Sequence, residues 1–461
     1  MKKSSVFIAL ALVVLCLVGW IGVGSQMAGE TSMYDTYVQQ ADDWVEKGLY
    51  QRAISRYNLA LEEQENQELY GKMNHAYQLW YEQAREDALD SYMDFLTSAV
   101  SAYPTDPELI KCFMEVFYSQ SRYEDLYWVL SNTVENGYTT EEIQKMLRIC
   151  RYAFDLQGEE FSGIRQPMGD IYIVSRNNLW NLYSSSQGYL LADGYDFVSP
   201  YGENGLVVVT SGTDSRIIDS SGMLWGIFEK TVTDAGRFSE GLVPACCDGE
   251  YGFYNDLGEM QFGGFEAAGA FQDGMAPVKK DGQWVLVDTA GNVKSQVFEE
   301  IVLDPQGNYL SGERFLAKSE GKYGIYNKEQ ELVCTLDCTD VDVYTQDELI
   351  AVCKDDKWGF VNAEGKMVLE PTYEQAKSFS YGLAAVCVDG KWGFIDPSGT
   401  LVIECQFSDT GYMTGSGICP VCTDPSEERT EQTDEQDAEN QDADSVLKRW
   451  KLLELELGIV E

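Results

Sequence analysis

Between about residues 165 and 422 the chain alternates short apolar runs with turns that contain glycine. The clearest example starts with the run 382–388, GLAAVCV, and continues through the turn Asp389-Gly390 into the segment WGFID. Asp-Gly suits a two-residue hairpin turn, because both central positions need positive φ. A second turn, Asp-x-x-Gly, ends at Gly399, and another apolar run, TLVIE, follows. The pattern predicts about three antiparallel strands in each such unit.

The apolar runs show no alternation with polar residues. Residues 383–386 are apolar at every position, whereas a strand with one face in water alternates. We therefore expect sheets that are covered on both faces, as in stacked blades or stacked rungs.

The unit recurs with a regular period. Seven segments of the WGFID type start 35, 36, 33, 39, 35 and 34 residues apart, which indicates structural repetition rather than a single site. They are headed by Trp180, Ser215, Tyr251, Trp284, Tyr323, Trp358 and Trp392. Glycine follows the first residue in four of them, as Gly252, Gly324, Gly359 and Gly393. A residue without Cβ lets another backbone come close, and the aromatic rings supply packing area between units.

These segments resemble the WG-repeat family, which is named for the Trp-Gly pair. The resemblance covers residues 165–422 and is strongest in the copies that begin at Trp358 and Trp392. It implies a bacterial β-repeat domain that serves binding or assembly and has no defined active site. Asn181, Arg216 and Val285 replace the glycine in weaker copies, so the resemblance does not imply the same function at every unit.

The number of strands favours a closed ring. The first apolar strand type occurs eight times, from Ile171 to Gly417, and the WGFID type seven times. A last copy that pairs with the first closes a ring and removes exposed strand edges. We expect a seven-unit, propeller-like β-repeat ring, favoured over an open β-solenoid. Asp389 and Asp396 are interpreted as turn formers rather than metal or sugar ligands, because Asp, Asn and Ser side chains all cap turns.

Residues 31–162 have helical periodicity and few turn signals. The segment 48–61, GLYQRAISRYNLAL, matches the pattern G-x-Y-x-x-A-I-x-x-Y-x-x-A-L and resembles the tetratricopeptide repeat. The resemblance implies antiparallel helix pairs that stack and bind peptides or neighbouring domains. A role as a spacer is an equally open alternative.

The N-terminus has the features of a membrane anchor. An uncharged run from Val6 to Val23 follows Lys2 and Lys3, and its length approaches that needed for a hydrocarbon core of about 30 Å. The sequence predicts an uncleaved signal anchor, a transmembrane helix within residues 1–30. It predicts a single-pass cell-membrane protein with a cytoplasmic N-terminus and the bulk of the chain extracytoplasmic.

The C-terminal tail has two parts. Residues 423–445 are rich in acids and lack large apolar side chains, which predicts a disordered linker. In residues 446–461, Leu447, Trp450, Leu453 and Leu457 share one face of a helix. This predicts an amphipathic C-terminal helix that either binds a partner or packs back on its own domain.

Composition limits the chemistry. The net charge of −43 argues against nucleic-acid binding, which needs a surplus of Lys and Arg. The single histidine, His75, has no Ser, Cys or Asp that can be placed beside it as a catalytic partner. Most of the twelve cysteines lie in apolar runs and are interpreted as buried hydrophobes. Two close pairs, Cys334 with Cys338 and Cys419 with Cys422, leave two alternatives open: a zinc site that uses both pairs, or a local disulfide within either pair.

No catalytic set can be assembled from the sequence. It therefore predicts a non-enzymatic, membrane-anchored, extracytoplasmic binding or scaffold protein without cofactor or metal. The expected partner is a protein or a cell-envelope polymer. The alternatives are a glycan hydrolase with paired carboxylates on the β-repeat loops and a sensory ectodomain.

Overall fold

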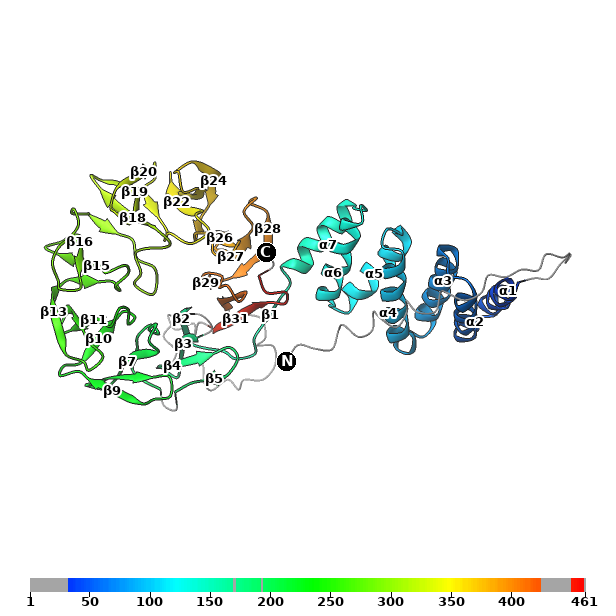
Figure 1. Ribbon diagram of the computed structural model, residues 1–461, viewed down its shortest axis with the longest axis horizontal. Coiled ribbons are helices and arrows are strands. Elements are labelled where there is room, and N and C mark those ends of the chain that lie inside the picture. The colour runs from blue at the N-terminus through cyan, green and yellow to red at the C-terminus, as the bar shows by residue number, and fades with distance from the viewer. Residues whose placement is uncertain (1–31, 169–170, 192–193, 424–448, 460–461) are drawn as a thin grey trace, which may run out of the picture. The chain divides into compact units, whose positions relative to one another are not determined.

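The computed structural model describes residues 32–168, 171–191, 194–423 and 449–459. The chain divides into two compact units. One comprises the chain up to Gln120 together with Asn132–Tyr138, and the other comprises Ser121–Ser131 and the chain from Thr139 onward. The first unit is helical, and the strands of the described chain lie in the second (Figure 1).

Successive helices of the first unit pack on one another. Their bounds are α1 Met33–Glu46, α2 Tyr50–Glu63, α3 Gln67–Gln83, α4 Arg85–Ala102 and α5 Pro107–Ser119, and the chain continues with α6 Tyr123–Glu135 and α7 Glu141–Arg151. Gly48 separates α1 from α2 at φ +70°, a conformation that glycine adopts without strain. Ala53 and Ala60 of α2 are fully buried, and their small side chains permit close helix packing. Membership of these helices in the tetratricopeptide family stays a prediction.

One polar network is buried among these helices. The hydroxyl of Tyr92 donates to Oδ1 of Asn74 at 2.9 Å, and Nδ2 of Asn74 donates to Sγ of Cys112 at 3.3 Å. Each of these buried polar groups therefore has a hydrogen-bond partner within the protein, as groups shielded from water require. His75 is exposed on α3.

The second unit contains eight antiparallel sheets, arranged as the blades of a β-propeller around a centre (Figure 1). We number them blades 1 to 8 in chain order. Blades 1 to 3 consist of β2 Gly163–Met168, β3 Ile171–Arg176, β4 Leu179–Ser184 and β5 Gly188–Tyr189; β6 Phe197–Val198, β7 Leu206–Ser211, β8 Asp214–Asp219 and β9 Leu224–Ile227; and β10 Val232–Ala235, β11 Val243–Cys247, β12 Glu250–Tyr254 and β13 Met260–Phe265. Blades 4 to 7 consist of β14 Ala267–Ala268, β15 Met275–Lys280 and β16 Gln283–Asp288; β17 Glu300–Ile301, β18 Arg314–Ser319, β19 Lys322–Asn327 and β20 Leu332–Thr335; β21 Asp340–Val341, β22 Ile350–Lys354, β23 Lys357–Val361 and β24 Met367–Tyr373; and β25 Gln375–Ala376, β26 Ala384–Val388, β27 Lys391–Ile395 and β28 Leu401–Phe407.

Blade 8 joins the two ends of the β region. Its strands are β29 Asp409–Thr410, β30 Ile418–Thr423, β31 Arg449–Leu455 and β1 Phe154–Leu156, in that order across the sheet. Because β31 pairs with β30 on one side and with β1 on the other, segments from both ends of the region close the ring. The propeller therefore extends beyond residues 165–422 on both sides.

The expected number of blades and the expected C-terminal helix are both wrong. The β-repeat ring has eight blades and not seven, and in the described part of residues 446–461 the segment Arg449–Leu455 is a strand and not the expected amphipathic helix. Trp450 and Leu453 lie in β31, Leu457 lies in the turn that follows, and Leu447 is outside the described residues. The open edges of β30 and β1 both offer backbone partners to this segment, so sheet pairing overrides its helical spacing.

The expected transmembrane helix and single-pass membrane localisation also need correction. In the part of the chain that the structure describes, no helix combines the length and the apolar character needed to cross a membrane. Residues 1–30, to which the anchor was assigned, and residues 424–445, assigned to a disordered linker, lie outside the described residues.

The core of the propeller lies between blades, as the absence of alternation predicted. Leu383, Ala384, Ala385 and Val386 are all buried. One cluster joins Leu286 of blade 4 to Phe315 and Ala317 of blade 5. Because consecutive strands are antiparallel, the loops between the first and second strands of all blades lie on one face, which we call the loop face. The two-residue turns between the second and third strands lie on the opposite face.

Candidate functional site

The repeat aromatics lie within the blades, on the third strand. Tyr323 and Trp392 are buried, and the other four are half-buried: Trp180, Tyr251, Trp284 and Trp358. A Cβ on Gly393 would lie 2.5 Å from the carbonyl oxygen of Ile403, and one on Gly359 would lie 2.6 Å from that of Leu369. Glycine is thus required there because the fourth strand passes directly over it.

The other two repeat glycines face similar but looser restrictions. A Cβ on Gly324 would meet a side-chain carbon of Leu332 at 2.6 Å, and one on Gly252 would lie 3.2 Å from the carbonyl oxygen of Phe262. The repeat positions therefore serve sheet packing, and none of them lines the cavities of the loop face described below.

The Asp-x-x-Gly turns confirm the interpretation of Asp396. Its Oδ1 accepts hydrogen bonds from the backbone N–H groups of Ser398 at 2.9 Å and Thr400 at 3.1 Å. The side-chain oxygen of Asn362 does the same for the backbone of residues 364 and 366. These side chains hold turns, as Asp and Asn commonly do.

A second set of carboxylates holds the two-residue turns, and sequence reasoning missed it. Each accepts a hydrogen bond from the backbone N–H of the turn glycine in its own blade, at 2.7 to 2.9 Å. The pairs are Asp196 with Gly212, Glu266 with Gly282, Glu299 with Gly321 and Glu374 with Gly390. The signal was an acid directly after an aromatic residue, as in Phe265-Glu266 and Tyr373-Glu374. Part of the large acidic charge is therefore structural.

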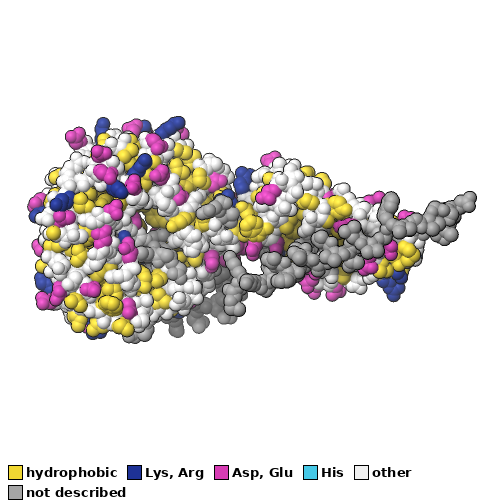
Figure 2. Space-filling view, viewed as in Figure 1, with side chains coloured by type: hydrophobic (Ala, Val, Ile, Leu, Met, Phe, Trp, Pro, Cys, Tyr) yellow, Lys and Arg dark blue, Asp and Glu magenta, His cyan; other side chains and the backbone are white. Residues whose placement is uncertain are grey.

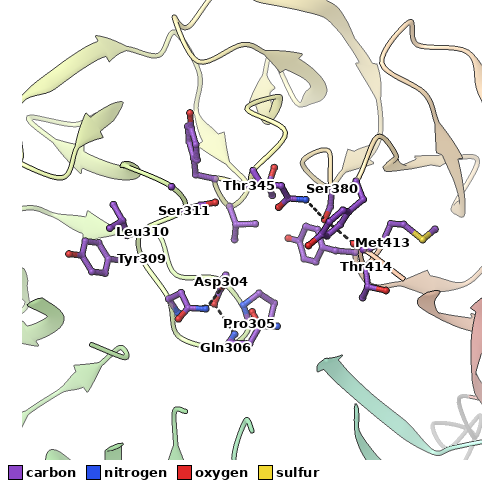
Figure 3. A pocket seen from close by; sticks show the side chains of 18 of the residues that line it. Asp304, Pro305, Gln306, Tyr309, Leu310, Ser311, Thr345, Ser380, Met413 and Thr414 are labelled. Atoms are coloured by element: carbon purple, nitrogen blue, oxygen red, sulfur yellow. Dashed lines mark hydrogen bonds between the residues drawn. The ribbon is translucent and has the colours of Figure 1, made fainter. Parts of the chain in front are cut away.

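The loop face contains one large cavity, of about 620 Å³, which we call the central cavity. It lies between the loops of blades 5 to 8. Figure 3 shows Asp304 to Gln306 on one side of the cavity, with Thr345 and Ser380 across from them. Tyrosine rings, hydroxyls, amides and apolar side chains line it, and its residues include Tyr309, Tyr344, Tyr381, Tyr412, Pro305, Gln306, Gln346, Ser311, Thr414, Ser416, Val302, Leu310, Val343 and Met413.

The blade-5 loop is held by its own hydrogen bonds and by side chains of blades 3 and 4. Oδ1 of Asp304 accepts from the backbone N–H of Gln306 at 2.9 Å and of Asn308 at 2.8 Å. Arg237 of blade 3 donates from Nε to Oδ1 of Asn308 at 2.6 Å, and Oε1 of Gln272 in blade 4 accepts from the backbone of residues 309 and 310. The pKa of Asp304 is raised, because burial raises it more than these hydrogen bonds lower it. The cavity is therefore preformed.

A second carboxylate lies behind the cavity wall. Asp342 accepts from the hydroxyl of Tyr412 at 2.7 Å and from the backbone N–H of Ser378 at 2.6 Å. Burial raises the pKa of Asp342, and burial together with Asp342 raises the pKa of Tyr412. The ammonium group of Lys377 lies 5.0 Å from the centre of the Tyr412 ring, in a cation–π contact. These groups join blades 6, 7 and 8.

Tyr381 is an unusual residue at the edge of the cavity. It has φ +52°, a left-handed conformation that is rare for a bulky residue, and its side chain is 44% exposed. A Cβ on Gly415 would lie 2.9 and 3.0 Å from two carbons of the Tyr381 ring and 3.3 Å from its hydroxyl oxygen, so the ring packs against the glycine. Tyr381 also borders a second cavity of about 320 Å³, lined by Tyr152, Leu383, Leu455 and Ile459 among others.

Other candidate chemistry does not gather at one place. Within the described ranges no group of three His, Cys, Asp or Glu side chains could hold a metal ion. Cys334, Cys338, Cys419 and Cys422 are free thiols in the structure. Burial raises the pKa of Cys338 and of Cys419 to about 12, so both are protonated and weakly nucleophilic at neutral pH.

Apolar side chains also reach the rim of the propeller. Met223, Leu224, Trp225 and Ile227 in and beside β9 are about half exposed or more. Figure 2 shows hydrophobic side chains on this part of the surface. β9 is the outer strand of blade 2, a short edge that residues 256–257 of blade 3 partly cover, since the backbone N–H of Ile227 donates to the carbonyl oxygen of Leu257 at 3.2 Å.

The comparisons with known proteins concern the β region. The model of the family described as "WG containing repeat" matches residues 251–284, 323–358, 358–392 and 392–424. Among solved structures, one titled "Crystal structure of the eukaryotic initiation factor" is 11% identical with a TM-score of 0.40, over 58% of this chain and 79% of that chain. Another, "KlHsv2 with loop 6CD replaced by a Gly-Ser linker", is 9% identical with a TM-score of 0.31, over 56% and 90%. Neither is close enough to inform function, and no curated protein matches the chain.

Proposed function

We propose that this chain is a non-enzymatic binding and scaffold protein whose central cavity holds part of an extended partner. The WG-repeat match and the propeller fold indicate a repeat protein of the binding or scaffold type. The observation that carries the proposal is the construction of the cavity. Loops from four blades converge on one space of about 620 Å³, a volume within the range of about 300–1,000 Å³ that ligand sites occupy.

The cavity wall is suited to binding rather than to hydrolysis. Among its lining residues Asp304 is the one carboxylate, and three hydrogen bonds already occupy it. A glycosidase needs two carboxyl groups on opposite sides of the scissile bond. Hydroxyl and amide groups, by contrast, orient a ligand without reacting with it.

The rigidity of the wall supports binding as well. Ser380 donates from its hydroxyl to the carbonyl oxygen of Met413 at 2.8 Å, and Thr414 donates to that of Ile418 at 2.8 Å. Such loops lose little conformational entropy when a ligand enters, so more of the contact energy appears as affinity.

The test is to block the cavity and to measure partner binding. Gln346 is exposed at the cavity, and Gln346→Trp would fill part of it. Gln283 is exposed beside a two-residue turn on the opposite face, so Gln283→Trp is a matched control. We expect partners isolated with the whole chain, whether proteins or polysaccharides, to lose at least about tenfold in affinity with Gln346→Trp only. Equal binding by both variants would place the partner elsewhere, and release of reducing ends from a bound polymer would show an enzyme.

A further inference from the structure

Resting on the proposed function, we propose that the ligand of the central cavity is a neutral glycan chain that stacks on Tyr381. The argument starts from the position of this residue in the fold. It occupies the turn between the first and second strands, just before Gly382, where Glu240, Asp273 and Asp347 occupy the same place in blades 3, 4 and 6. Tyr381, Glu240 and Asp273 share a left-handed φ of +51° to +52°.

An aromatic residue is the costly choice at this position. Left-handed backbone is unfavourable for a bulky side chain, and strain of this kind commonly marks functional sites. Three other blades place an acid there, which keeps the turn soluble, whereas Tyr381 exposes 44% of its side chain.

The ring is held as a platform. Gly415 lies against one side of it, so closely that any side chain at this position would displace the ring. Tyr381 also lines both the central cavity and the smaller cavity of about 320 Å³. A fixed, flat, half-exposed ring between two cavities suits a ligand with flat apolar faces that extends past it on both sides.

The remaining wall gives the chemical class. The central cavity is lined by tyrosine rings, hydroxyls, amides and the apolar side chains of Val302, Leu310, Val343 and Met413; apart from Asp304 its lining residues carry no charge. A sugar presents C–H faces to rings and hydroxyls to polar groups, and so matches such a wall. The net charge of −43 repels acidic polymers, which favours a neutral glycan.

Two polar groups have hydrogen-bonding capacity left for ligand hydroxyls. The hydroxyl of Tyr344 is buried beside the side chains of Arg314 and Glu348, but its contacts with them do not have the geometry of well-formed hydrogen bonds. Leaving such a group unpaired is costly. Nε2 of Gln346 reaches the hydroxyl of Ser380 only at 3.4 Å, a long contact that a ligand can replace.

The experiment measures binding of neutral oligosaccharides to the whole chain by calorimetry, with malto-, cello- and chito-oligosaccharides as probes. We expect one series to bind, with affinity that rises with chain length until both cavities are filled. Tyr381→Ala should lower the affinity by about tenfold or more, and Tyr381→Phe should retain it. Tyr189→Ala, at an exposed tyrosine on the outer strand of blade 1, is the control.

A second variant separates binding from folding. Tyr381→Asp restores the residue type of blade 4, so it should raise the melting temperature while abolishing glycan binding. Loss of both would indicate a purely structural tyrosine and overturn the proposal. Binding of peptides but not glycans, with the same dependence on Tyr381, would overturn the glycan class and leave the proposed function intact. Binding of a partner that Gln346→Trp does not weaken would overturn both.

Discussion

Blades 7 and 8 have the same pattern of paired residues across their strands, although the strands of blade 8 come from distant parts of the chain. In blade 7, Trp392 pairs with Cys387 on the second strand and with Phe407 on the fourth. In blade 8, Trp450 pairs with Cys422 and, through an isolated bridge, with Phe161. The order Cys, Trp, Phe across the sheet is the same, although Phe161 lies far before Trp450 in sequence.

The connections are what differ. Asp389-Gly390 joins β26 to β27, whereas residues 424–448 separate Thr423 from its partner Arg449. Register in a covered sheet is fixed by which side chains must face the core. The comparison teaches that the side-chain pattern of the repeat determines which residues pair across neighbouring strands, and that the length of the connections does not.

The largest expected effect comes from removing the last strand. A chain that ends at residue 445 lacks β31, which leaves the edges of β30 and β1 unpaired and the buried Leu452 and Leu453 missing. We expect the propeller to lose cooperative thermal unfolding, as measured by circular dichroism. The matched control keeps β31 and replaces residues 424–448 with Asn-Gly. This variant should fold and gain about 2 kcal/mol from the shorter loop, so an unfolded control would mean that the insertion itself organises the blade.

The two tryptophans provide a milder comparison. Trp392 is 8% exposed, so Trp392→Ala should cost about 3–5 kcal/mol, the range for buried aromatic truncation. Trp450 is half-buried, so Trp450→Ala should cost less. Urea unfolding of the whole chain, followed by tryptophan fluorescence and circular dichroism, measures both values. A larger loss at Trp450 would show that closure depends on this side chain more than on strand pairing.

The glycine that follows distinguishes the blades further. Gly393→Ala places a Cβ 2.5 Å from the carbonyl oxygen of Ile403, so we expect a loss of about 1–3 kcal/mol from overpacking. Blade 8 has Lys451 at this position, so Lys451→Ala should change stability by less than about 0.5 kcal/mol. The same denaturation experiment applies, and equal losses in both blades would remove the close-approach explanation for the WG pair.

Much of the propeller could be predicted from the sequence. The period of the WGFID segments predicted the blades, and the two turns of each unit predicted the strands. The absence of alternation predicted sheets that are buried on both faces. The sequence has eight strands of the first apolar type but seven of the WGFID type, so one apolar strand lacked a WGFID strand to pair with. Phe161-Ser162 also matches Phe407-Ser408 at the end of a fourth strand, a signal for the eighth blade before the first repeat.

The rest depends on contacts distant in sequence. The sequence predicts a helix over residues 446–461 because Leu447, Trp450, Leu453 and Leu457 fit its period. Residues 449–455 form a strand instead because they pair with the edges of β30 and β1. The central cavity could not be predicted either, because its wall comes from irregular loops of four blades. Tyr381 gave no periodic signal, and only its backbone conformation and exposure distinguish it.

The smallest effect concerns the turn at Asp396. Its Oδ1 accepts from two backbone N–H groups, so Asp396→Ala should cost about 1 kcal/mol. Asp396→Asn should cost almost nothing, because Asn362 holds the equivalent turn of blade 6 with an amide oxygen. Blade 8 has Glu454 at this position, exposed and bound by the side chain of Gln157 at 2.9 Å. Glu454→Ala should therefore change the free energy of unfolding by less than about 0.5 kcal/mol. Equal losses for Asp396→Ala and Asp396→Asn in chemical denaturation would mean that the negative charge matters, and not the hydrogen-bond acceptor that the repeats share.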